Sequence, residues 1–168
     1  MRHNKVLIIG SYPVVNPQHG GQKRAKAILD FYKREFGDAK YVGVFHRGQY
    51  TEWSKDDLPL GDPDIIAAVD KKPYASEIIC GEAVDKDIHV RSYLAKMLLE
   101  YHPTVIHIEQ PFVYLGLKPL LSELGLKPFI VFGSQNIEYI LKRRIFKNLK
   151  VAPRLSDCLL YTSPSPRD

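Results

Sequence analysis

Cysteine is scarce in this chain, and its scarcity excludes two classes of small protein. Cys80 and Cys158 are the only two cysteines among 168 residues. Two cysteines make neither a disulfide framework nor a metal-ligand set. The six histidines include no pair spaced four residues apart, so we expect no metal site.

Long apolar runs are also missing. No run approaches the ~18 residues that a membrane-spanning helix needs. Four strongly apolar residues precede Gly10, which is too short a run for a signal peptide and is typical of a first β-strand. We therefore expect a protein of the cytoplasm, and peripheral contact with the inner face of the membrane stays open.

The composition is that of one globular domain with a mild basic excess. Hydrophobic residues make up 45% and charged residues 26% of the chain, and the formal net charge is +5. The densest basic cluster is Lys142-Arg143-Arg144. This balance favours anionic ligands such as phosphates or acidic lipids, and it is too weak to indicate nucleic-acid binding.

The last eleven residues differ in character from the rest of the chain. Residues 158–168 show no hydrophobic period and end in a Ser-Pro repeat, which is typical of a flexible linker. They also resemble the translation of a transposase-type sequencing-library adapter at every position. We therefore expect a native domain over residues 1–157, incomplete at its end, and a non-native tail over residues 158–168.

Hydrophobic periodicity predicts an α/β fold. Short apolar runs predict strands, and stripes of apolar residues three and four apart predict helices. Their alternation is typical of an open, Rossmann-like parallel sheet with helices on both faces. The expected core strands cover residues 5–9, 40–45, 104–108 and 129–132, with a minor strand over 76–80. The expected helices cover residues 22–36, 63–71, 85–101, 112–124 and 138–149, with caps at Gly37, Asp62 and Gly125.

Ligands of an open α/β sheet bind beyond the carboxyl ends of its strands. Three loops follow expected core strands and are the candidate binding segments: residues 10–24, 109–114 and 133–139. None of them holds a P-loop or the Gly-x-Gly-x-x-Gly dinucleotide pattern.

The first loop indicates an anion site. Gly20 and Gly21 come directly before a helix, where a close backbone approach and free N–H groups suit a phosphate. Lys23 and Arg24 lie in the first turn, where the helix dipole disfavours cations and a bound anion would offset that cost. A plain Gly-Gly turn with solvated basic residues is the alternative.

The other two loops carry carboxylates and amides, which are suited to recognising hydroxyl groups. Glu109 and Gln110 follow the third core strand, and Glu109 is a candidate either for sugar hydroxyls or for a salt bridge. His107, inside that strand, is expected to be a core histidine. Asn136 and Glu138 lie in the third loop, where Asn136 is alternatively a helix cap.

Three segments together resemble a known family. Lys5 to Pro13, then His19-Gly20-Gly21 with Arg24, resembles the opening of a family 4 retaining glycosyltransferase of the GT-B fold. Residues 104–109 resemble that family's central strand. Residues 132–139, followed by Lys142-Arg143-Arg144, resemble its His-Asn-Val-Glu segment, with Gln135 in place of the histidine.

The resemblance implies the amino-terminal, acceptor-side domain of such an enzyme. The whole enzyme transfers a sugar from a nucleotide-sugar donor to a hydroxyl of a sugar, a lipid-linked sugar or a polysaccharide, and it uses no further cofactor. Its donor site lies mainly in a second Rossmann-like domain, which becomes the expected partner of this one. The resemblance implies that Gly20, Gly21 and Arg24 contact phosphate or acceptor and that Asn136 and Glu138 line the cleft. With Glu109 and Gln110, which follow the third core strand, these are the predicted substrate-binding residues. A freestanding flavodoxin-like domain that binds a phosphate ligand is the alternative.

Overall fold

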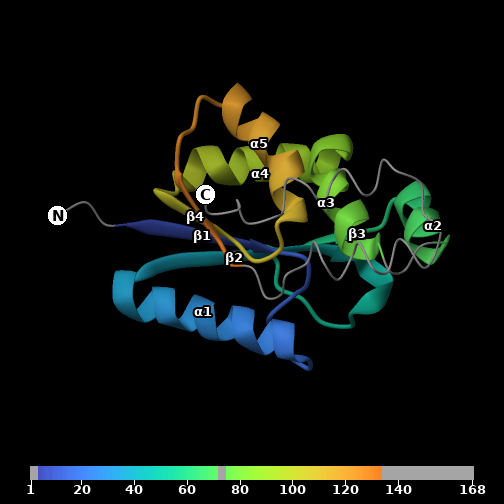
Figure 1. Cartoon of the computed structure of the whole chain (residues 1–168), viewed down its shortest axis with the longest axis horizontal. Coiled ribbons are helices and arrows are strands. Elements are labelled where there is room, and N and C mark those ends of the chain that lie inside the picture. The colour runs from blue at the N-terminus through green and yellow to red at the C-terminus, as the bar shows by residue number, and fades with distance from the viewer. Residues whose placement is uncertain (1–3, 72–74, 134–168) are drawn as a thin grey trace, which may run out of the picture. The chain divides into compact units, whose positions relative to one another are not determined.

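The computed structural model describes residues 4–71 and 75–133, which belong to one compact unit. Within them, five parallel strands form one sheet in the order β3-β2-β1-β4-β5 (Figure 1). The strands are β1 (Lys5–Gly10), β2 (Asp38–His46), β3 (Leu58–Leu60), β4 (Val105–Ile108) and β5 (Phe129–Phe132). The predicted open parallel sheet is confirmed, with β1 at its centre beside β4.

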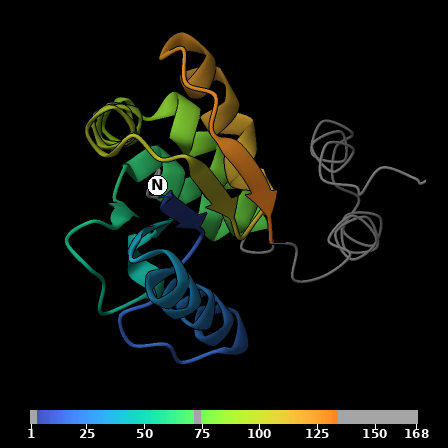
Figure 2. The same ribbon diagram turned by 90° about the vertical axis from the view of Figure 1, so that its left-hand side faces the viewer.

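Helices cover both faces of this sheet. Figure 1 shows α1 (Gly20–Phe36) on one face and α3 (Ser76–Lys86), α4 (Ile88–Tyr101) and α5 (Phe112–Glu123) on the other. A single 3-10 turn, η1 (Arg47–Gln49), follows β2, and α2 (Pro63–Lys71) follows β3. The turned view in Figure 2 shows the same separation of α1 from the α3–α5 layer. Residues 4–71 and 75–133 include no helix that is long and apolar enough to cross a membrane.

The central strand contributes to two hydrophobic cores because its side chains alternate between the two faces. Leu7 and Ile9 pack into the larger core beneath α3, α4 and α5, whereas Val6 and Ile8 pack into the smaller core beneath α1. All four are essentially inaccessible to solvent. A strand buried on both faces reads as a continuous apolar run, as residues 6–9 do.

The predicted minor strand over residues 76–80 is wrong, because these residues begin helix α3. The run Ile78-Ile79-Cys80 is too short to distinguish a strand from a buried helix by periodicity. Tertiary packing decides, since α3 approaches α5 closely. A Cβ on Gly81 would lie 2.6 Å from the Phe112 carbonyl oxygen, and one on Gly116 would lie 2.9 Å from the Gly81 oxygen.

The remaining element boundaries are close to those expected. The helix predicted over residues 85–101 is divided at Asp87, whose carboxylate accepts the N–H groups of His89 and Val90 and so begins α4. Strand β3 has no counterpart among the strands expected from the sequence. The caps at Gly37 and Asp62 are confirmed. The helix predicted over residues 138–149 and the tail over 158–168 lie outside the described residues.

Candidate functional site

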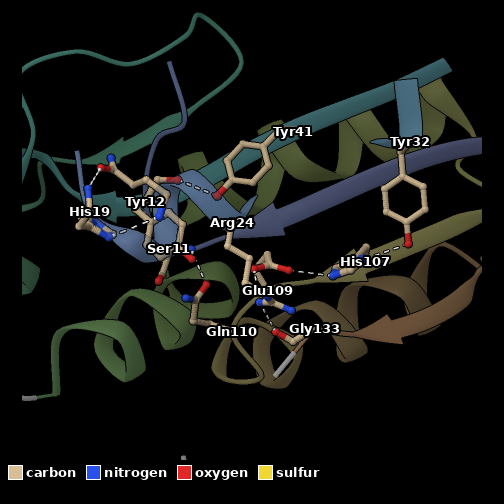
Figure 3. A network of polar contacts seen from close by, with 11 residues as sticks. Ser11, Tyr12, His19, Arg24, Tyr32, Tyr41, His107, Glu109, Gln110 and Gly133 are labelled. Atoms are coloured by element: carbon tan, nitrogen blue, oxygen red, sulfur yellow. Dashed lines mark hydrogen bonds and ion pairs between the residues drawn. The ribbon is translucent and has the colours of Figure 1, made fainter. Parts of the chain in front are cut away.

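The candidate site lies at the point where the chain reverses its direction across the sheet. From β1 the chain passes through α1 to β2 on one side, and from β4 it passes through α5 to β5 on the other. The loops that follow β1 and β4 therefore separate at this point, where doubly wound sheets bind ligands. Glu109 N–H donates to the Ile9 carbonyl (3.0 Å), and Ser11 N–H donates to Gln110 Oε1 (3.2 Å). Figure 3 shows the side chains that converge there.

A capping box fixes the loop between β1 and α1. His19 Nδ1 accepts the Gln22 N–H (3.4 Å), while Gln22 Oε1 accepts the N–H groups of His19 and Gln18. Gln22 Nε2 donates to the Pro13 carbonyl (2.8 Å), so a side chain that is only 2% exposed holds both ends of the loop. The His19 ring also meets the Tyr12 ring edge-on, with 5.2 Å between centroids.

The first N–H groups of α1 are open to a ligand. Within the part of the chain that the structure describes, the N–H groups of Gly20 and Gly21 have no hydrogen-bond partner. Gly20 is exposed, and a Cβ built on it would meet nothing within 4 Å. Unsatisfied N–H groups at a helix N-terminus favour a negative charge.

Arg24 reaches from α1 to the ends of β4 and β5. Its Nη1 donates to Glu109 Oε2 (2.8 Å) and to the Gly133 carbonyl (2.9 Å). The Glu109 side chain is fully buried, whereas the Arg24 side chain keeps 38% of its surface exposed. The buried carboxylate thus offsets the cost of a cation near the start of α1. Arg24 Nε and Nη2 have no partner among residues 4–71 and 75–133.

A second chain of hydrogen bonds reaches Glu109 from the opposite side. His107 Nε2 lies 2.8 Å from Glu109 Oε1, and the Tyr32 hydroxyl lies 3.0 Å from His107 Nδ1. An ionised carboxylate only accepts hydrogen bonds, so His107 Nε2 donates to Glu109. In the tautomer that carries its proton on Nε2, Nδ1 accepts the Tyr32 O–H. Burial, together with the Glu109 charge, raises the pKa of Tyr32 and keeps it a donor.

Gly133 makes this arrangement sterically possible. Its N–H donates to the Ile108 carbonyl (2.8 Å), which brings the end of β5 against β4. A Cβ built there would collide with His107 Nε2 and Glu109 Oε1. The absence of a side chain therefore lets the Gly133 carbonyl reach Arg24 while the His107–Glu109 pair stays intact.

Some buried polar atoms near the carboxyl ends of β1 and β2 have no hydrogen-bond partner among the described residues. They are Ser11 Oγ, in the loop after β1, and both ring nitrogens of His46, at the end of β2. Nearby, the Tyr41 hydroxyl donates to the Tyr12 carbonyl (2.8 Å). Burial raises the pKa of Tyr41 well above its ordinary value, so this hydroxyl stays protonated.

The structure brings several of the predicted site residues together. Arg24 contacts Glu109 directly, Gln110 holds the loop after β1, and Gly20 and Gly21 begin the helix that carries Arg24. Asn136 and Glu138 lie outside the described residues. Of the two readings of Glu109, the structure shows the salt bridge; direct contact with a substrate stays a prediction. The expectation that His107 is a hydrogen-bonded core histidine is confirmed.

Sequence reasoning missed four residues that organise the site: His19 as the helix cap, Gln22, Tyr32 and Gly133. The capping box of His19 and Gln22 departs from the usual Ser or Thr at the cap position. Tyr32 lies within the helix predicted over residues 22–36, on its apolar stripe. Its contact with His107 depends on how α1 packs across the sheet, and no local spacing encodes that packing.

The site can bind a negatively charged or hydroxyl-rich group, and it holds no cluster suited to a metal. No group of three or more His, Cys, Asp or Glu side chains able to hold a metal ion occurs in residues 4–71 and 75–133. The free N–H groups of Arg24 and of the start of α1 are donors suited to phosphate oxygens.

The fold and the site define an α/β protein with a Rossmann-like, doubly wound parallel sheet and an open donor-rich edge. Comparison of the chain with protein-family models, with curated proteins and with solved structures finds no match.

Proposed function

We propose that this chain is the acceptor-side, amino-terminal domain of a retaining glycosyltransferase of the GT-B fold. The observation that supports the proposal best is the exposed Arg24 guanidinium, which Glu109 and the Gly133 carbonyl hold at the carboxyl edge of the sheet. The described parts of the three segments that resemble family 4 enzymes lead to this edge: the loop before α1, the end of β4, and residues 132–133 at the end of β5.

The proposed role of this edge is electrostatic. A glycosyl transfer from a nucleotide sugar leaves a diphosphate, whose developing negative charge must be stabilised in the transition state. The guanidinium N–H groups of Arg24 and the N–H groups of Gly20 and Gly21 are donors suited to that charge. Gln110 and Asn136 would contact hydroxyl groups of the acceptor, and the second Rossmann-like domain would bind most of the donor.

A domain that binds a phosphate ligand without any transfer chemistry is the second candidate. The same Arg24 and helix N-terminus favour it. The strand order β3-β2-β1-β4-β5 matches the Rossmann order, whereas a flavodoxin-like sheet runs 2-1-3-4-5. A phosphate-binding module with this strand order would therefore not be flavodoxin-like in topology.

Two substitutions in the complete enzyme test the proposed role. Arg24→Ala removes a charged hydrogen bond and should weaken transition-state binding by about 1.5–3 kcal/mol, read as kcat/KM for glycosyl transfer. Gly21→Val should place a branched side chain where the phosphate approaches, and it should impair turnover far more than folding.

Lys33→Ala is the matched control, because Lys33 is an exposed cation on the same helix. It should leave kcat/KM within about twofold of the parent enzyme, as a screened surface charge does. Unchanged turnover in both Arg24→Ala and Gly21→Val would remove the loop before α1 from the active site.

A further inference from the structure

We propose that Tyr32 and His107 are positioning residues that hold the Arg24 guanidinium, through Glu109, in the orientation that receives a phosphate group. This inference deepens the proposed function and relies on it only for the nature of the ligand. The residues concerned come from α1, β4 and the loop that follows β4, as Figure 3 shows.

An unbroken series of hydrogen bonds joins Tyr32 to Arg24. Contacts of 3.0 Å, 2.8 Å and 2.8 Å join the Tyr32 hydroxyl to His107, His107 to Glu109, and Glu109 to Arg24. Each carboxylate oxygen of Glu109 has its own partner in this chain, Oε1 facing His107 and Oε2 facing Arg24. The two contacts together fix the plane of the carboxyl group, so His107 restrains the carboxylate that Arg24 contacts.

The four hydrogen-bonded side chains differ in how deeply they are buried. His107 and Glu109 are 6% and 1% exposed, so they are shielded from solvent. Arg24 is the end that faces water, and Tyr32 also lies near the surface of α1. His107 and Glu109 are thus buried groups whose hydrogen bonds hold a partly exposed guanidinium in one orientation. A surface salt bridge without such support contributes little to stability.

The unpartnered edge of the Arg24 guanidinium indicates which class of ligand it binds. Nη1 of Arg24 is occupied by Glu109 Oε2 and the Gly133 carbonyl, whereas Nε and Nη2 have no partner in the described part of the chain. The Nε–H and one Nη2–H of a guanidinium lie side by side and suit two oxygens of one phosphate or carboxylate. Because Glu109 holds Nη1, the free edge has a fixed direction, and such preorganisation reduces the entropy cost of binding.

The test uses the full chain and inorganic pyrophosphate at fixed ionic strength. Titration is followed by the ¹⁵N–¹H signal of Arg24 Nε, and the His107 tautomer is followed by its ring ¹⁵N shifts. Tyr32→Phe keeps the ring and removes only the hydroxyl. It should weaken pyrophosphate binding about threefold to tenfold, the loss expected for one hydrogen bond. It should also change the His107 ring shifts and speed the rotation of the Arg24 guanidinium.

A second pair of variants separates positioning from packing. His107→Gln keeps an N–H that can donate to Glu109, and His107→Leu has similar size without it. Pyrophosphate should bind His107→Gln at least threefold more tightly than His107→Leu. Tyr114→Phe is the matched control, because the Tyr114 hydroxyl makes no hydrogen bond to the described residues and its ring packs on Phe132. It should leave the affinity unchanged.

Equal affinities for the parent chain, Tyr32→Phe and His107→Leu would overturn the proposal, as would an Arg24 signal that pyrophosphate does not shift. This binding test and the test of the proposed function can give different results. Pyrophosphate binding that depends on Tyr32 and His107, without glycosyl transfer by the complete enzyme, would support this inference and contradict the proposed function. Transfer with unaltered binding in the variants would do the reverse.

Discussion

At the scale of single residues, the segment directly after β5 depends on a glycine, Gly133. Gly133 lies where any Cβ would collide with the facing atoms of His107 and Glu109. Its carbonyl is also one of the two acceptors of Arg24 Nη1. The same position thus leaves room for the buried pair and supplies the second acceptor of Arg24 Nη1.

Gly133→Ala should therefore destabilise the fold and disturb the site together. Overpacking a close contact of this kind costs roughly 1–3 kcal/mol. Gly61→Ala is the control, because a Cβ there meets nothing within 4 Å. Urea unfolding of the two variants measures the difference. Equal stabilities would show that the chain near Gly133 moves aside at little cost.

Asp57 provides a pH-dependent contribution to stability. Its carboxylate accepts the N–H groups of Gly43 (2.6 Å) and Ser54 (2.8 Å), yet burial raises its pKa above the ordinary 3.8 despite these hydrogen bonds. The folded protein then binds this proton more tightly than the unfolded chain does. Its contribution to stability is consequently greatest below pH 3.8 and is lost as the pH rises through the higher folded-state pKa.

Asp57→Asn removes this titration, so comparing the two proteins isolates it. The free energy of unfolding of the parent should fall relative to that of Asp57→Asn as the pH rises from about 3.8. Urea denaturation at a series of pH values measures the difference. A gap between the two proteins that does not change with pH, or that changes in the opposite sense, would contradict the assignment.

At the scale of elements, α1 is the helix that positions the site, and an unusual cap begins it. His19 supplies a ring nitrogen to the Gln22 N–H where Ser, Thr, Asp or Asn is usual. Gln22 returns the contact and ties the loop to Pro13. The register of α1, and hence the reach of Arg24, depends on this capping box.

His19→Ala should lower the free energy of unfolding by about 1 kcal/mol, the usual cost of removing a cap. His19→Asn should restore most of that loss, because its side-chain oxygen caps well although it lacks the ring that meets Tyr12. Chemical denaturation compares the three proteins. If Asn were no better than Ala, the stabilising contact of His19 would be its ring packing and not its hydrogen bond.

The elements also show how much of the fold can be predicted from the sequence. Residues 6–9 predicted their strand because an uninterrupted apolar run suits a strand buried on both faces. Residues 78–80 have a similar run and belong to α3, because the close packing against α5 through Gly81 and Gly116 outweighs a local pattern. Arg24 and Glu109 were predictable as site residues from their place after strands. Their contact with each other, 85 residues apart, was not.

At the scale of the whole molecule, the topology gathers the site from distant parts of the chain. The reversal between β1 and β4 places the loop before α1 next to Gln110, and the parallel register of β4 with β5 places Gly133 beside Glu109. The open parallel sheet followed from the alternation of elements in the sequence. The hydrogen-bonded order of Tyr32, His107, Glu109 and Arg24 required the packed structure.

Turnover of a nucleotide sugar decides whether this domain serves glycosyl transfer. Residues 1–157 and a gene product whose reading frame continues through a second Rossmann-like domain should be assayed side by side. The anomeric configuration of the product is read by ¹H NMR. We expect the longer protein to transfer the sugar with retention, and Arg24→Ala to weaken this transfer. We expect no transfer by residues 1–157. Turnover by residues 1–157 alone, or none by the longer protein over a panel of nucleotide sugars, would contradict it.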